Sequence, residues 1–191
     1  MDKNKSKLII VEGPQGTGKT TLTNYLRDNL PGANLYRLSG QKDKTKSGKE
    51  ISVVMYNALI DYMKVMQVVP MDMIFDRTFF TEEVYARLGY KSYTFTEEYE
   101  NLLNELSKLN YDIYIISLYL ENSDLFKERL TREYHHNYQS FSIENSVNQQ
   151  NIYKKLFDEV KEKYKNIKVL ELSTDNYEKA YDQINKIFCI K

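Results

Sequence analysis

The sequence predicts a three-layer α/β fold in which a five-stranded parallel sheet is flanked by helices. Five short apolar segments alternate with segments of helical spacing, which is the pattern of a parallel sheet covered on both faces. A glycine-rich turn follows the first apolar segment directly, as it does where a buried strand leads into a helix. Because no repeat or compositional break divides the chain, we expect one domain over residues 1–191.

The predicted strands are apolar runs with few charges. The first reads KLIIVE and stops at Gly13, whereas DIYIISLYL, at 112–120, is the strongest strand signal in the chain. The five strands are predicted at 7–12, 34–38, 71–76, 112–120 and 167–172.

Apolar residues at helical spacing predict helices between these strands. Pro31-Gly32, Pro70 and Gly89 stop the first three, and Thr94 with Glu97 offers a capping box for the fourth. The helices are predicted at 19–30, 50–69, 82–88, 94–109, 123–132 and 146–165, and from a cap at Thr174 or Asp175 to about Cys189. The polar segments 39–49 and 133–145 are predicted loops.

Bulk composition excludes several classes of protein. The formal net charge is zero, so no global field attracts nucleic acid or an anionic membrane, although a local basic groove stays possible. Cys189 is the single cysteine, which excludes an internal disulfide framework and a cysteine-built metal site. No segment is apolar for long enough to span a membrane, and we expect a cytoplasmic protein.

The strongest motif is the segment Gly13–Thr20, which reads GPQGTGKT and fits G-x-x-x-x-G-K-[ST] completely. Its glycines let successive backbone N–H groups point into one hollow, and the following helix adds the positive end of its dipole. We therefore predict that it binds ATP. Lys19 is expected to reach the β- and γ-phosphates, and the Thr20 hydroxyl to ligate Mg²⁺. The remaining predicted contacts to the nucleotide are Gly13, Gln15, Gly16, Thr17, Gly18 and Thr21.

A second candidate site follows the third predicted strand. Asp76 and Arg77 lie at its carboxyl end, which is the edge where open α/β sheets bind ligands. Asp76 is predicted to hold the Mg²⁺ shell together with Thr20, and Arg77 to clamp a phosphate through two parallel hydrogen bonds.

These segments resemble thymidylate kinases and the related deoxynucleoside kinases, a group with the P-loop kinase fold. The resemblance rests on IIVEGPQGTGKTTL, which includes Glu12, and on FDRTFFTEEVY at 75–85. It continues through YLENSDLFKERLTRE at 119–133 and VLELSTDNYEKAYDQI at 169–184, in the same order. It implies a kinase that moves the γ-phosphate of ATP to a nucleotide or nucleoside.

The resemblance also implies roles for individual residues. Arg77 would contact the acceptor nucleotide, with Glu12 beside it. Arg129 would stack on the adenine or touch the phosphates, and Arg132 would stabilise charge on the transferring group, next to a lid at about 133–145. We assign no chemistry to His135 and His136, which lie in that predicted loop.

Two further residues are candidates for the acceptor site. Phe79 and Phe80 follow the Asp-Arg pair, and Phe80 could stack on an acceptor base, although packing of both rings in the core is favoured. Arg37, at the end of the second predicted strand, is expected near the acceptor phosphate.

The acceptor is predicted from the chemistry that it requires. A nucleoside kinase needs a carboxylate base near the end of the second strand, and none follows Arg37 directly. A monophosphate acceptor is already ionised and needs cations instead, which favours a nucleoside monophosphate. The open alternatives are a deoxynucleoside kinase with Asp76 or Glu12 as base, a polynucleotide or modified-base DNA kinase that uses the lysines of 42–49, and an ATPase switch. A homodimer is also open.

Overall fold

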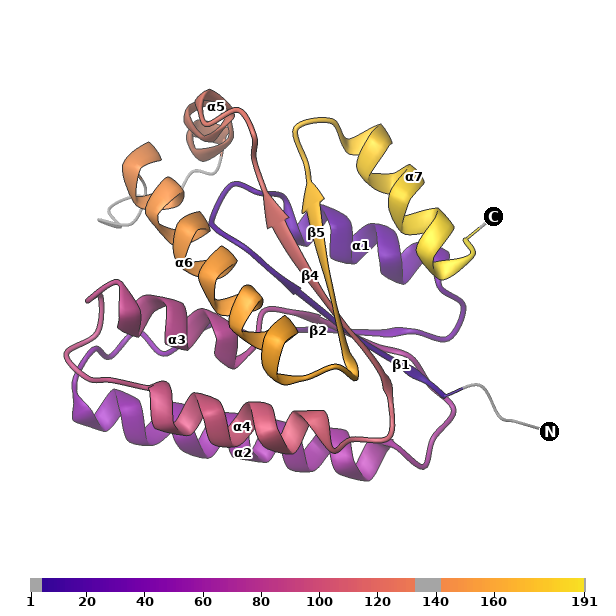
Figure 1. The fold of residues 1–191 in the computed structure, drawn as a ribbon, viewed down its shortest axis with the longest axis horizontal. Helices are drawn as coiled ribbons and strands as arrows, with labels where there is room; N and C mark the ends of the chain where they lie inside the picture. The colour runs from indigo at the N-terminus through magenta and orange to yellow at the C-terminus, as the bar shows by residue number, and fades with distance from the viewer. Residues whose placement is uncertain (1–4, 133–141, 191) are drawn as a thin grey trace.

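The computed structural model describes residues 5–132 and 142–190 (Figure 1). Five parallel strands form one sheet in the order β2-β3-β1-β4-β5. The strands are β1 (Lys7–Glu12), β2 (Asn34–Arg37), β3 (Met73–Asp76), β4 (Asp112–Tyr119) and β5 (Ile167–Ser173). The helices are α1 (Lys19–Asn29), α2 (Lys46–Met66), α3 (Phe79–Arg87), α4 (Thr96–Ser107), α5 (Asp124–Arg132), α6 (Ile143–Lys163) and α7 (Tyr177–Phe188).

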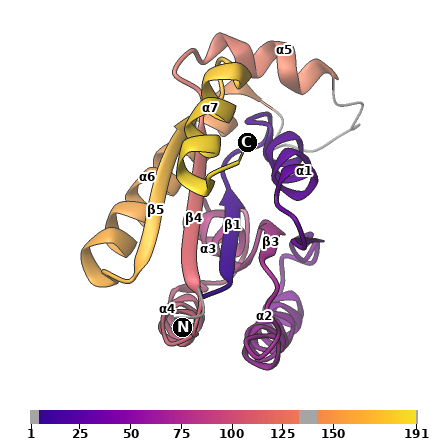
Figure 2. The same ribbon diagram turned by 90° about the vertical axis from the view of Figure 1, so that its right-hand side faces the viewer.

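Alternate residues of β1 enter two different apolar cores. Leu8 and Ile10 belong to the larger core, which α2, α3, α4 and α6 cover. Ile9 and Val11 belong to the second core, which α1 and α7 cover on the opposite face of the sheet (Figure 2). Helix α5 lies beyond the carboxyl ends of the strands in both views (Figures 1 and 2). The predicted three-layer fold with a five-stranded parallel sheet is confirmed.

Three helices, α2, α3 and α6, begin earlier than their sequence pattern indicates. Helix α2 starts at Lys46, inside the segment predicted as a loop. Helix α3 starts at Phe79 instead of residue 82, and every residue from Phe79 to Val84 is buried. Because the first turns of α3 are buried on all sides, they show no apolar periodicity that could mark the start of the helix.

Two predicted caps are wrong, and α6 has a cap that the sequence pattern did not indicate. Helix α4 begins at Thr96 without a side-chain cap, so the capping box at Thr94 is wrong. Ser142 accepts a hydrogen bond from the backbone of Asn145 and starts α6, so the predicted lid overlaps this helix at its end. Asn176 caps α7 in place of Thr174 or Asp175. Thr174 instead donates to the Thr17 carbonyl in the segment Gly13–Thr20, which we call the phosphate loop after its predicted role. Asp175 accepts hydrogen bonds from the backbone of Glu121 and Asn122 in the turn between β4 and α5. No local sequence pattern reveals these tertiary contacts.

Within residues 5–132 and 142–190, no helix combines the length and apolar character that crossing a membrane requires.

Candidate active site

The loop between β1 and α1 has the backbone of a phosphate-binding hollow. Gly13, Gly16 and Gly18 have φ angles of 146°, 83° and 79°, which residues with a side chain rarely adopt. A Cβ atom on Gly13 would lie 2.5 Å from the Leu118 carbonyl oxygen, and one on Gly18 would lie 1.8 Å from the Tyr177 hydroxyl. Both conformation and close packing therefore require glycine at these two positions.

Lys19 lies across this loop. Its Nζ donates to the carbonyl oxygens of Gly13 and Pro14 at 2.7 and 2.6 Å, and its side chain is buried. Thr17 closes the same turn, since its hydroxyl donates to the Pro14 carbonyl at 2.8 Å. The cation is thus already held against the hollow. Of the other predicted contacts, Gln15 is partly exposed and Thr21 is exposed.

Thr20 and Asp76 meet at the carboxyl edge of the sheet, although 56 positions separate them in the chain. The Thr20 hydroxyl donates to Asp76 Oδ2 at 3.0 Å. Arg37 approaches the same oxygen with its Nε at 3.8 Å and also binds Asn24. A hydroxyl and a carboxylate are the hard oxygen ligands that Mg²⁺ accepts alongside phosphate and water. Among the described residues, no group of three or more His, Cys, Asp or Glu could hold a metal ion.

Arg77 occupies a strained position directly after β3. Its φ angle is +73°, in the left-handed region that costs a residue with a Cβ roughly 1–2 kcal/mol. Its backbone N–H donates to the Val11 carbonyl at 3.1 Å, which continues the β1–β3 pairing by one residue. Across the described part of the chain, its partly buried guanidinium has no ion pair and no hydrogen bond. A cation in this state is prepared to bind an anion.

Glu12 lies beneath Arg77 and is completely buried. Its Oε1 accepts from the Thr78 N–H at 2.6 Å and from the Thr78 hydroxyl at 3.2 Å. Its Oε2 is 2.8 Å from the Thr81 hydroxyl and 3.2 Å from the Tyr153 hydroxyl. Burial raises the pKa of Glu12 to about 7, although the hydrogen bonds from Thr81 and Thr78 and the charges of Arg77 and Lys19 oppose this shift. The Glu12 carboxylate is thus occupied by contacts to Thr78, Thr81 and Tyr153, and its predicted contact with an acceptor stays a prediction.

Phe80 is a core residue. Its ring is fully buried and packs against Phe79, Phe157 and Tyr99, with centroids 4.7, 5.4 and 5.6 Å away. The structure therefore favours packing in the core over stacking on an acceptor base.

Arg129 connects α5 to the phosphate loop. Its guanidinium donates to the Gly16 carbonyl at 3.4 Å and to the Thr174 carbonyl at 2.6 Å. It also lies over the Tyr177 ring, 5.0 Å from the centroid. Arg129 therefore lies beside the loop between β1 and α1, with an aromatic ring on one face, and its predicted contact with a nucleotide stays a prediction. The side chain of Arg132, the two histidines and lid residues 133–141 lie outside the described structure.

The sequence matches no protein-family model and no curated protein, but solved structures share its fold. A deoxyadenosine kinase from M. mycoides, with products dCMP and a flexible dCDP bound, matches with a TM-score of 0.66 and 16% identity, over 96% of this chain and 100% of that chain. Thymidylate kinase from Candida albicans also gives 0.66, with 14% identity over 96% and 91% of the two chains. The M. mycoides enzyme with bound dATP gives 0.60, at 14% identity over 94% and 98%. The chain has their P-loop kinase fold.

In this P-loop kinase fold, the acceptor side contains charged residues that the sequence pattern did not single out. Glu82 is fully buried, pairs with Lys91 at 2.8 Å and accepts a hydrogen bond from Tyr93. Its second oxygen, Oε2, has no partner among the described residues and faces Gly40. The sequence signal for this buried charge was the pair Glu82-Glu83 after FDRTFFT. Without the tertiary structure, two consecutive acidic residues indicate only the exposed start of a helix.

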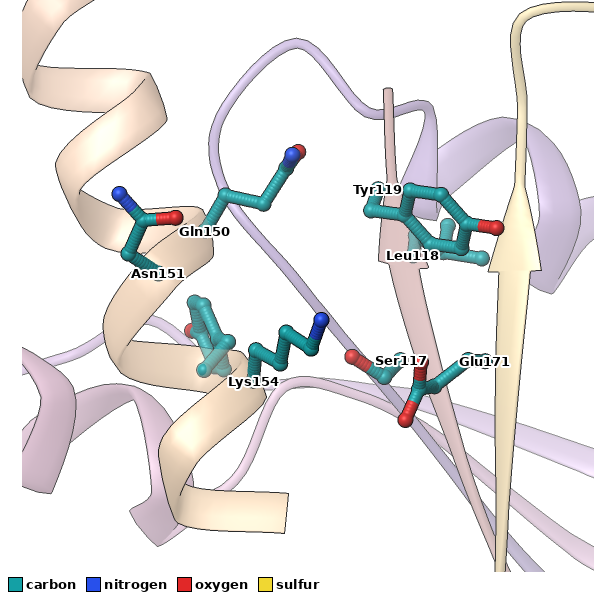
Figure 3. Close-up of a pocket in the computed structure, with 8 residues that line it drawn as sticks. Ser117, Leu118, Tyr119, Gln150, Asn151, Lys154 and Glu171 are labelled. Atoms are coloured by element: carbon teal, nitrogen blue, oxygen red, sulfur yellow. The ribbon is translucent and has the colours of Figure 1, made fainter. Parts of the chain in front are cut away.

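A cavity of about 270 Å³ adjoins the site between α6 and strands β4 and β5. The ammonium of Lys154 points toward Ser117 and Glu171 across it (Figure 3). Tyr153 lines the same cavity, and its hydroxyl reaches Glu12. Since Ser117 pairs with Glu12 in the sheet, the cavity lies beside the end of β1.

Proposed function

We propose that this protein is an ATP- and Mg²⁺-dependent kinase that phosphorylates a (deoxy)nucleoside monophosphate. The observation that carries this proposal is the unpaired guanidinium of Arg77 at the edge of the sheet that also holds the phosphate loop. An arginine fork at this point matches the dianionic phosphate of an acceptor. The fold shared with nucleoside and nucleotide kinases adds support.

The proposed mechanism relies on position and charge, because phosphoryl transfer asks little covalent chemistry of the protein. Lys19 exchanges its loop carbonyls for the β- and γ-phosphates. Mg²⁺ held at Thr20 and Asp76 would neutralise charge on the same phosphates when bound. Arg77 holds the acceptor phosphate in line, and Arg37 adds positive charge beside Asp76. Arg129 borders the adenine side, and Arg132 is the proposed cation for the transferring group.

A deoxynucleoside kinase is the second candidate, because carboxylates do lie near the acceptor side. Asp76 is the better candidate for its base, since Glu12 is buried beneath four hydrogen-bond contacts. A base must reach the proton that it removes, and Glu12 is shielded by the residues that it holds.

The test is a screen of the common nucleosides and nucleoside monophosphates with labelled ATP and Mg²⁺. We expect at least one monophosphate to be phosphorylated and nucleosides to be poor acceptors. Transfer to nucleosides alone would establish the second candidate. Transfer only to oligonucleotides, with steep salt dependence, would indicate a polynucleotide kinase, and hydrolysis without any acceptor would indicate an ATPase switch.

We also propose that a second copy of the chain covers an apolar face of α2. Val54 and Val65 are 71% and 69% exposed, and Ile51 and Tyr62 continue the same stripe. These positions are symmetric about Ala58, so a two-fold axis there would pair Val54 with Tyr62 and Ile51 with Val65 of the other copy. Lys64, on the flank of α2, already pairs with Asp61 and Glu105 of its own chain at 3.4 and 3.1 Å, so the apolar stripe alone carries this proposal.

Sedimentation velocity tests this dimer. Wild-type protein should sediment as a dimer at micromolar concentration, and Val54→Lys should sediment as a monomer. Val68→Lys is the control, because Val68 is 87% exposed but lies beyond the end of α2. A monomeric wild type, or a dimer that survives Val54→Lys, contradicts the proposal.

A further inference from the structure

The carboxylate of Glu12 joins three segments that are distant in the sequence. It ends β1, immediately before the phosphate loop. Its partners are Thr78 and Thr81, at the start of α3, and Tyr153, in the middle of α6. The Thr81 and Tyr153 hydroxyls are also 2.9 Å from each other, which closes the network. One buried side chain therefore connects the loop that follows β1, the turn that carries Arg77, and α6.

This network holds the residue with the unfavourable backbone. Arg77 keeps its positive φ only if its neighbours fix the chain on both sides. Before it, the β1–β3 pairing extends through the bond from its own N–H to Val11. After it, the N–H of Thr78 donates to Glu12 at 2.6 Å. Glu12 thus supplies the second of the two backbone restraints that aim the guanidinium.

We propose that Glu12 is a positioning residue that keeps Arg77 and α6 in register with the phosphate loop, so that the acceptor phosphate meets the γ-phosphate. This inference rests on the proposed function, because it assigns Arg77 to the acceptor. Glu12 itself does not touch the reacting groups; it acts through Thr78 and Tyr153.

A second buried carboxylate shows what a purely structural role looks like. Glu83 is equally buried, but it accepts from Arg87 and Thr96 at 2.8 and 2.9 Å and has no bond to the phosphate loop or Arg77. Glu12, by contrast, has no cation within ion-pair distance in the described structure, although Arg77 and Lys19 both act on its charge. A carboxylate buried without a paired cation is costly, so its place between two phosphate-binding cations is better explained by position than by stability.

The test compares steady-state kinetics and ATP affinity for matched pairs of variants. Glu12→Gln keeps the shape of the side chain but removes its charge, and Glu83→Gln is its control. Tyr153→Phe removes one hydroxyl from the network. Its control is Tyr99→Phe, since the Tyr99 hydroxyl is buried and has no hydrogen-bond partner among the described residues. Thermal denaturation of each variant confirms that it is folded.

We expect Glu12→Gln to lower kcat/KM for the acceptor about 10- to 100-fold, because a misplacement of roughly 1 Å costs this much, while the Kd for ATP changes less than about threefold. Tyr153→Phe should give a smaller loss of the same kind, and both controls should match wild type in acceptor kcat/KM.

Equal losses in Glu12→Gln and Glu83→Gln, or normal acceptor kinetics in Glu12→Gln, would overturn this inference but not the proposed function. If Glu12→Gln does not fold, Tyr153→Phe decides, and wild-type acceptor kinetics in that variant overturn the inference. A wild-type protein that phosphorylates no acceptor overturns the proposed function, and the inference with it.

Discussion

The donor and acceptor sides of the candidate site are built in opposite ways. The donor side is one continuous segment from Gly13 to Thr20, whose glycine φ angles and lysine contacts arise within eight positions of the chain. The acceptor side combines the ends of β1 and β3 with residues of α3 and α6, so that Glu12 and Tyr153 meet across 141 positions.

Because of this difference, we expect the two sides to respond differently to amino-acid substitutions and to pH. A local loop depends on its own backbone, so a substitution there should act on nucleotide binding directly. A site assembled from distant segments depends on buried polar contacts, so substitutions should act through position and through pH. The following predictions test this contrast.

Lys19→Ala should have the largest effect. Because one cation serves both terminal phosphates, we expect phosphoryl transfer to fall at least about 1,000-fold, at the upper end of losses for a single electrostatic contact. The fold should survive, since the Lys19 Nζ donates to the Gly13 and Pro14 carbonyls of its own loop. Kinetics and thermal denaturation measure the two quantities, and unchanged turnover in a folded variant would refute the phosphate-loop assignment.

Arg77→Ala should mainly damage use of the acceptor. Loss of a charge-assisted contact of this kind costs roughly 2–5 kcal/mol, which is a 30- to several-thousand-fold fall in acceptor kcat/KM. Arg77→Lys should recover little, because one ammonium cannot form two parallel hydrogen bonds. Calorimetry should show near-normal affinity for ATP in both variants. The exposed Arg27→Ala is the control, and acceptor kinetics like those of this control would remove Arg77 from the site.

Glu12 should make the folded protein less stable as pH rises. Its pKa is raised by burial from 4.5 to about 7, so the folded state holds a proton that the unfolded state has lost between these values. The free energy of unfolding should therefore fall by about 1.4 kcal/mol per pH unit in this window, or by about 3 kcal/mol in all. Other titrating groups add their own slopes, so the difference from Glu12→Gln isolates this contribution.

Urea denaturation at pH 5 and pH 8 measures that difference. The variant should gain stability relative to wild type at pH 8, even though it loses acceptor activity. A parallel pH dependence in both proteins would show that Glu12 does not titrate in this range.

Gly18→Ala should have the smallest of these effects, a loss of folding stability that arises from the local backbone of the loop. Its positive φ costs an alanine roughly 1–2 kcal/mol, and the new Cβ would collide with the Tyr177 hydroxyl. Gly32→Ala is a matched control, since Gly32 has a φ angle of 76° and nothing within 4 Å of an added Cβ. The excess destabilisation of Gly18→Ala over Gly32→Ala, from denaturant titrations, measures the contact with Tyr177. Equal values would show that Tyr177 moves aside without cost.

Local signals in the sequence determined most of the fold and the donor side. All five strands were located to within two residues at each end. Strands β1, β3 and β4 are largely buried and are therefore continuous apolar runs, whereas β2 and β5 are only partly buried. The motif from Gly13 to Thr20 specifies its own conformation through glycine, and the structure brings its last residue, Thr20, to Asp76. The binding roles predicted for these residues stay predictions. Helix starts were less predictable, because burial of Phe79–Val84 on all sides removes the periodicity that marks a helix.

Only the tertiary structure decided how the acceptor side is held together. Whether Phe80 packs in the core, whether Glu12 contacts a ligand or Thr78 and Tyr153, and whether Glu82 pairs with Lys91 all depend on helices that meet across the sheet. A carboxylate looks the same in a sequence whether it lies in solvent or in the core. Its pKa and its role arise from desolvation and from hydrogen-bond donors that are supplied by distant segments, and these exist only once the chain has folded.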